Sequence, residues 1–146
     1  MANENLSALI EGNNVQITET WMRAVRNDAR IESDAALTRL ELRDHVPAII
    51  EEICELLRAD ETPNPGNTLE GRVKVYLRFQ QGYRGRELGR EVSLLRTVIL
   101  DFLAGRCTEP SLNLGVEAYY PAARIINLYM DEILINAIST YSETLE

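Results

Sequence analysis

The sequence has little of the chemistry that metal sites and disulfide frameworks need. It contains two cysteines, one histidine and one tryptophan in 146 residues. Cys54 and Cys107 each lie within an apolar helical pattern and show no ligand or disulfide spacing, so we predict two reduced core residues. The histidine, His45, has no Cys or carboxylate partner at ligand spacing, which favours a structural role. We therefore expect no metal and no cofactor.

Long hydrophobic runs are also absent. No apolar run reaches the roughly 18 to 20 residues that a membrane span needs. The first residues, "MANENLSALIEGNNV", lack the basic start and apolar centre of a signal peptide. We expect a cytoplasmic protein with no membrane partner. The net charge of −8 also disfavours nucleic acid, because binding a polyanion needs a dominant basic surface.

Strand signals are nearly absent, whereas helical apolar spacing occurs along most of the chain. We predict an all-α fold, a single helical domain over residues 1–146 with about five to six helices. A loop rich in proline and polar residues, "ADETPNPGNT", divides it but does not separate two domains. The expected helices cover about 5–27, 44–57, 69–81 and 85–106, with a last helix that starts at Val116 or Pro121 and is kinked if it starts before the proline.

The basic residues are concentrated in one segment. Residues 72–96 hold seven of the 15 Lys and Arg residues and only two acidic ones, so the segment has a charge of +5 and the rest of the chain −13. Within it, "GYRGRELGREVSLLR" raises the possibility of a phosphate-binding loop. However, no strand precedes it, no Lys-Ser/Thr pair follows it, and Gly89 falls inside a helical pattern.

The residues therefore favour a corner between two helices, with Gly82 as the cap of the first and Gly89 allowing close helix approach. In this interpretation Glu91 and Arg96 are partly buried and paired, and Arg84 and Arg86 are exposed. The alternative is a small-anion site. Its candidate ligand-binding residues are Arg78, Tyr83, Arg84 and Arg86.

The sequence contains no catalytic motif, so we predict no enzymatic activity. The last helix is apolar almost all round. One stripe, comprising Ile126, Tyr129, Met130, Ile133 and Ala137, can face the core of the domain. The second stripe comprises Leu128, Ile135, Ile138 and Leu145, and a symmetric partner helix would bury it. We expect a homodimer with these four residues in its interface.

The segments "TWMRAVRNDARI", "LRDHVPAIIEEICELL", "RFQQGYRGRELGREVSLLR" and "DEILINAISTYSETLE" together resemble a bacterial family. It is the N-terminal sensory domain of RsbRD-type stressosome co-antagonists and of many cytoplasmic sensor histidine kinases. The resemblance rests on the order Arg78, Gly82, Tyr83, Glu91 and Arg96, preceded by Trp21 and His45. Members often have a histidine where this chain has Lys74, so a role tied to that histidine does not transfer.

The resemblance implies a non-catalytic sensory and dimerisation module, with globin-like packing as one arrangement of its helices. It also implies that the last helix continues into an output domain. A relation to globins raises the question of haem, but His45 beside Pro47 at a helix start is a poor axial ligand. Trp21, His45, Glu91 and Arg96 are then polar residues of the core. The runner-up function is the anion binder described above.

Overall fold

The computed structural model describes residues 2–143, which form an all-α bundle without strands, and the predicted fold class is confirmed. The α-helices are α1 (Ala2–Gly12), α2 (Asn14–Asn27), α3 (Arg39–Arg43), α4 (Val46–Ala59), α5 (Leu69–Gln80), α6 (Gly85–Cys107) and α7 (Gly115–Glu143). Among the described residues, three short 3-10 helices lie in the connections, namely η1 (Ser33–Ala36), η2 (Pro65–Asn67) and η3 (Pro110–Leu112).

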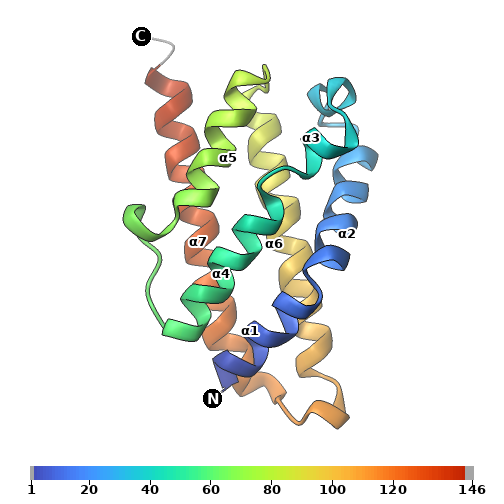
Figure 1. The fold of residues 1–146 in the computed structure, drawn as a ribbon, viewed down its shortest axis with the longest axis vertical. Coiled ribbons are helices and arrows are strands. Elements are labelled where there is room, and N and C mark those ends of the chain that lie inside the picture. The colour runs from blue at the N-terminus through green and yellow to red at the C-terminus, as the bar shows by residue number, and fades with distance from the viewer. Residues whose placement is uncertain (1, 144–146) are drawn as a thin grey trace.

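Two long neighbouring helices, α6 and α7, run in opposite directions along the long axis of the molecule (Figure 1). Helix α5 lies against α7, α2 lies against α6, and α1 packs on α4. The corner between α5 and α6 is at the same end of the bundle as the end of α7. Buried side chains from these helices form one core, which includes Leu6, Ile10, Trp21, Val25, Ile50, Leu57, Val75, Leu88, Ile99, Ile126 and Met130. Cys54 and Cys107 are buried and unpaired in it.

The first predicted helix is broken in two, which corrects the sequence interpretation. Helix α1 ends at Gly12 and α2 begins at Asn14. Glycine in a helix lowers its stability. The side-chain amide of Asn13 donates to the Leu9 carbonyl at 2.8 Å, which satisfies an acceptor at the end of α1. The side-chain amide of Asn14 donates to the carbonyl of Pro47 at 3.1 Å, so a contact with α4 also fixes the position of the break. The apolar spacing continues across it and gave no signal.

The connection between α5 and α6 is the predicted corner. Gly82 has a φ of 82°, a left-handed conformation that glycine adopts readily. Its N–H donates to the Phe79 carbonyl at 3.2 Å, and the N–H of Tyr83 donates to the Arg78 carbonyl at 3.0 Å. These bonds satisfy carbonyls at the end of α5 in the manner of a glycine-capped helix. The corner fixes where α6 begins.

Gly89 does not have the close-packing role that we expected. A Cβ atom built at Gly89 would meet nothing within 4 Å. The close approach is instead at Gly71 on α5, where a Cβ atom would lie 2.6 Å from Cγ1 of Ile133 on α7. The absence of a side chain at Gly71 therefore sets the distance between α5 and α7.

Helix α7 has two different faces. The stripe predicted to face the core is buried, with Tyr129 and Met130 at its centre. On the outer face, Ile135 is 56% exposed and Ile138 is 67% exposed, whereas Leu128 is partly buried. Leu145 lies outside the described residues. Pro121 is inside α7 rather than at its start, so the Val116 alternative is close to the observed start at Gly115.

No helix within residues 2–143 combines the length and the apolar character needed to cross a membrane.

Candidate functional site: a buried ion pair beside an arginine pocket

An ion pair lies in the core between α5 and α6. The Nε atom of Arg78 donates to Oε1 of Glu91 at 2.8 Å, and the side chains are 1% and 2% exposed. The other two guanidinium nitrogens donate to Oε1 of Gln81 at 2.6 Å and to the Leu42 carbonyl at 3.0 Å. Arg78 therefore joins α5 to α6 and to α3, and its buried charge has a counter-charge.

Two further side chains surround this pair. The indole N–H of Trp21 donates to the backbone carbonyl of Glu91 at 3.0 Å, which joins α2 to α6. The ammonium group of Lys74 lies 5.0 Å from the centre of the Trp21 ring, within the range of a cation–π contact. The buried site thus has contributions from α2, α5 and α6.

Lys74 is itself buried. Its Nζ atom donates to the backbone carbonyls of Leu42 in α3 at 3.3 Å and of Asp44, just after α3, at 3.2 Å. Burial, with the nearby positive charge of Arg78 as the second cause, lowers the pKa of Lys74 to about 7. Near neutral pH this lysine therefore changes charge inside the protein.

Tyr83 connects the ion pair to the end of α7. Its ring lies under the Arg78 guanidinium, with 4.8 Å between the guanidinium carbon and the ring centre. Burial raises the pKa of the Tyr83 hydroxyl. The hydroxyl of Tyr141 on α7 donates to the Tyr83 carbonyl at 2.8 Å, and the Tyr141 ring stacks edge-on against Phe79 at 5.3 Å. The corner between α5 and α6 is thus bonded directly to the last turns of α7.

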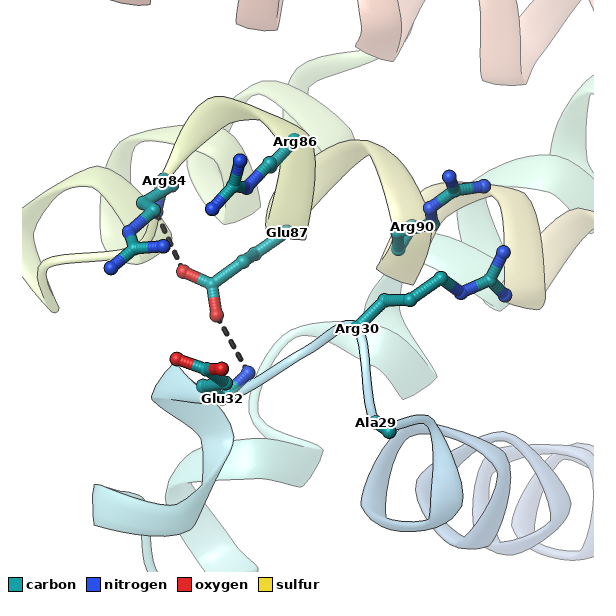
Figure 2. Close-up of a pocket in the computed structure, with 7 residues that line it drawn as sticks. All are labelled: Ala29, Arg30, Glu32, Arg84, Arg86, Glu87 and Arg90. Carbon is teal, nitrogen blue, oxygen red and sulfur yellow. Dashed lines mark hydrogen bonds between the residues drawn. The ribbon is translucent and has the colours of Figure 1, made fainter.

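A pocket of about 300 Å³ lies next to this corner, between the start of α6 and the connection from α2 to η1 (Figure 2). Four arginines contribute to its wall. The lining residues are Ala29, Arg30, Glu32, Arg84, Arg86, Glu87 and Arg90. Figure 2 shows Arg84 and Arg86 at one end of the pocket and Arg30 and Arg90 at the other.

The carboxylate of Glu87 holds the two walls of this pocket together. It accepts hydrogen bonds from the backbone N–H groups of Glu32 at 2.7 Å, Ser33 at 2.8 Å and Arg84 at 3.0 Å, and from the Ser33 hydroxyl at 2.7 Å. Burial alone would raise its pKa, but these hydrogen bonds prevail and lower the pKa of Glu87 to about 2. Glu87 is therefore a fixed anion that positions backbone.

The predicted ligand-binding residues are not brought together at one point. Arg78 and Tyr83 are buried in the core, whereas Arg84 and Arg86 are exposed and line the pocket. The glycine-rich corner is not a phosphate loop, because its N–H groups are already bonded. Those of Gly82 and Tyr83 donate to carbonyls of α5, and that of Arg84 donates to the Glu87 carboxylate. The pocket instead presents arginine side chains.

The other predicted polar residues lie in separate places. Arg96 is partly buried and pairs with Asp131 on α7 at 3.2 Å. His45 precedes α4 with a φ of 69°, and its Nδ1 atom lies 3.4 Å from a carboxylate oxygen of Glu70. Within residues 2–143, no group of three His, Cys, Asp or Glu side chains is arranged to hold a metal ion.

Sequence reasoning missed four residues of the site. Lys74 gave no signal of burial, because a lysine in a basic helical segment is usually exposed. The carboxylate of Glu87 accepts from backbone N–H groups of a distant segment, a role that no local pattern indicates. Arg90 lies four residues after Arg86, a spacing that puts both on one face of a helix and could have indicated a shared site. Arg30, in a different segment, gave no signal.

A comparison with family models agrees with the resemblance seen in the sequence. The model described as the RsbT co-antagonist protein rsbRD N-terminal domain matches residues 15–146. No curated protein and no solved structure matched the chain. Because the family match covers most of the sequence, the chain belongs to the RsbRD N-terminal domain family.

Proposed function

We propose that this member of the RsbRD N-terminal domain family is a non-catalytic sensory input domain that forms a homodimer through the outer face of α7. In this proposal α7 leads on to an output domain of a stressosome co-antagonist or of a sensor histidine kinase. A change inside the bundle reaches that output as a movement of α7.

The observation that supports the proposal best is the two-sided character of α7. Its inner face is buried in the core, and it is the longest helix among the described residues. On its outer face Ile135 and Ile138 are more than half exposed, three residues apart and therefore on one side of the helix. A symmetric partner helix would remove these side chains from water.

The buried polar groups also favour a structural and sensory role over catalysis. Glu91 is paired with Arg78, and Glu87 is held by four hydrogen-bond donors. Carboxylates that are buried and bonded to neighbouring helices in this way position those helices and are poorly placed to act on a substrate. Tyr141 connects this network to α7, the helix through which we propose that the signal leaves.

Sedimentation equilibrium over a range of micromolar concentrations tests the dimer. The mass should approach twice 16.5 kDa for the wild type. Ile135→Glu should give a monomer with unchanged helical circular dichroism, because it places a charge in the apolar interface. The matched control is Leu40→Glu, which adds the same charge at a residue of α3 that is 68% exposed. It should remain dimeric.

Two results would overturn the proposal. One is a wild-type protein that keeps the monomer mass as concentration rises. The other is an Ile135→Glu variant that remains a dimer.

A further inference from the structure

We propose that the pocket lined by Arg30, Arg84, Arg86 and Arg90 binds a small phosphate-bearing anion, and that Tyr141 transmits its presence to α7. The binding step stands on the pocket alone. The transmission step rests on the proposed function, in which α7 passes the signal to an output.

Most of the arginines in this pocket are not engaged by carboxylates. Arg84, Arg86 and Arg90 are exposed at the pocket, and none forms an ion pair with a carboxylate among residues 2–143. Arg30 already binds Asp28 through two of its nitrogens, at 2.9 and 2.8 Å. Three guanidinium groups are therefore available to a ligand, whereas the charge of Arg30 is matched by that of Asp28.

The acidic groups near the pocket do not neutralise its positive charge. Three carboxylates, those of Asp28, Glu32 and Glu87, lie in or beside a pocket that has four arginines. The oxygens of Glu87 face backbone N–H groups and the Ser33 hydroxyl rather than guanidinium groups. A positive site remains on a protein whose net charge is −8. This contrast between the pocket and the rest of the chain favours an anionic ligand.

The guanidinium groups of the pocket match the geometry of a phosphate group. A guanidinium group presents its N–H donors in a planar fork that pairs with two oxygens of a phosphate. The start of α6 adds the positive end of a helix dipole on the same side. A volume of about 300 Å³ suits a small molecule rather than a polymer. The shared chemistry is a phosphate group, either free or carried by a small metabolite.

The corner that holds Arg84 and Arg86 also touches α7. Arg84 lies between Tyr83, whose carbonyl accepts from the Tyr141 hydroxyl at 2.8 Å, and Gly85, where a Cβ atom would lie 3.5 Å from the Tyr141 ring. An anion that draws Arg84 and Arg86 toward the pocket therefore acts on backbone that Tyr141 contacts. The bond to Tyr141 then reports the change near the end of α7.

Thermal melts at constant ionic strength test the binding step, with inorganic phosphate, pyrophosphate or adenosine monophosphate exchanged for chloride. At least one probe should raise the melting temperature of the wild type in a saturable manner, since binding to the folded state stabilises it. Arg84→Ala/Arg86→Ala should lose this response. Arg43→Ala/Arg124→Ala removes two exposed arginines elsewhere and should keep it.

These probes also separate the two sources of phosphate. Equal affinity for inorganic phosphate and the monophosphate ester indicates a free-phosphate site, and tighter binding of the ester indicates a metabolite. The absence of a saturable response to all three probes would overturn the proposal. A response that is equally strong in Arg84→Ala/Arg86→Ala would do the same, because it would place the binding elsewhere.

Hydrogen exchange tests the transmission step. A saturating probe should change the protection of the amides in the last turns of α7 in the wild type. Tyr141→Phe keeps the ring against Phe79 and removes the hydroxyl that bonds to Tyr83. It should bind with an affinity within about twofold of the wild type while the change in α7 is lost.

Unchanged protection in the wild type at saturation would overturn the transmission step. A wild-type protein that stays monomeric and still binds the probe would instead contradict only the proposed dimer.

Discussion

Glu91→Ala should lower the free energy of unfolding by about 3–5 kcal/mol, because it leaves a buried guanidinium without its counter-charge. Arg78 and Glu91 are 1% and 2% exposed, so water cannot replace the lost carboxylate without opening the core. The remaining acceptors of Arg78 are the Gln81 side chain and the Leu42 carbonyl, both neutral. They satisfy hydrogen bonds but do not balance the charge, which keeps the expected loss in this range.

Urea denaturation gives the measurement, followed by circular dichroism and by tryptophan fluorescence. The only tryptophan, Trp21, bonds to the carbonyl of Glu91 and therefore reports on the site itself. Arg84→Ala and Arg86→Ala are matched controls from the same segment, and each should change stability by less than about 0.5 kcal/mol. Glu91→Gln, which keeps an acceptor for Arg78, should lose less than Glu91→Ala.

A second variant separates the energy of the pair from the cost of an unpaired charge. Arg78→Met/Glu91→Leu removes both charges and fills most of the space, so it should be more stable than Glu91→Ala. A loss of less than about 1 kcal/mol in Glu91→Ala, or a double variant that is less stable than Glu91→Ala, would show that Arg78 does not need this counter-charge.

Two further predictions concern Lys74 and the glycines. Between about pH 7 and 9 the free energy of unfolding should rise with pH, by at most about 1.4 kcal/mol per pH unit, because the unfolded chain binds a proton at Lys74 that the folded protein has lost. Urea denaturation at each pH measures this slope, and Lys74→Met should flatten it. Burial raises the pKa of Cys54 to about 11, so above pH 9 the titration of Cys54 lowers the free energy of unfolding as pH rises. Gly71→Ala should lower stability by about 1–3 kcal/mol, because its Cβ atom meets Ile133. Gly89→Ala places a methyl group in open space within α6 and should raise stability by about 0.5–1 kcal/mol. Thermal melts compare the two variants, and equal effects would show that α7 does not crowd Gly71.

The features that depend on neighbouring residues in the sequence were predictable. Apolar spacing indicated the helices, and Gly82 indicated the end of α5, because both depend on local backbone geometry. The buried stripe of α7 followed from its period in the same way. The break at Asn13 was missed because the apolar spacing continues through it, and a contact with Pro47 helps to fix it.

The site itself depended on contacts between distant segments. Lys74 is buried because Leu42 in α3 and Asp44 just after it supply two carbonyls for its ammonium group, and no local pattern indicates such partners. Arg30 reaches the pocket from the connection after α2, more than fifty residues before Arg84 in the sequence. Gly71 and Gly89 could not be distinguished from sequence, because only the approach of α7 decides which of them is crowded.

The register of α6 explains why one basic segment serves two purposes. Its apolar face contains Leu88 and Val92, and at about 100° per residue the positions two residues earlier point about 200° away. Those positions are Arg86 and Arg90, which therefore face the solvent and the pocket. Glu91, one residue before Val92, flanks the apolar face instead and reaches the core.

Adjacent residues of α6 thus belong to different networks, and their substitutions should have separable effects. Arg90→Ala removes a pocket side chain that forms no hydrogen bond or ion pair among the described residues, so it should weaken phosphate binding and leave stability nearly unchanged. Glu91→Ala, one position further, should lower stability through Arg78. The opposite assignment of these two effects would mean that α6 does not have the register described here.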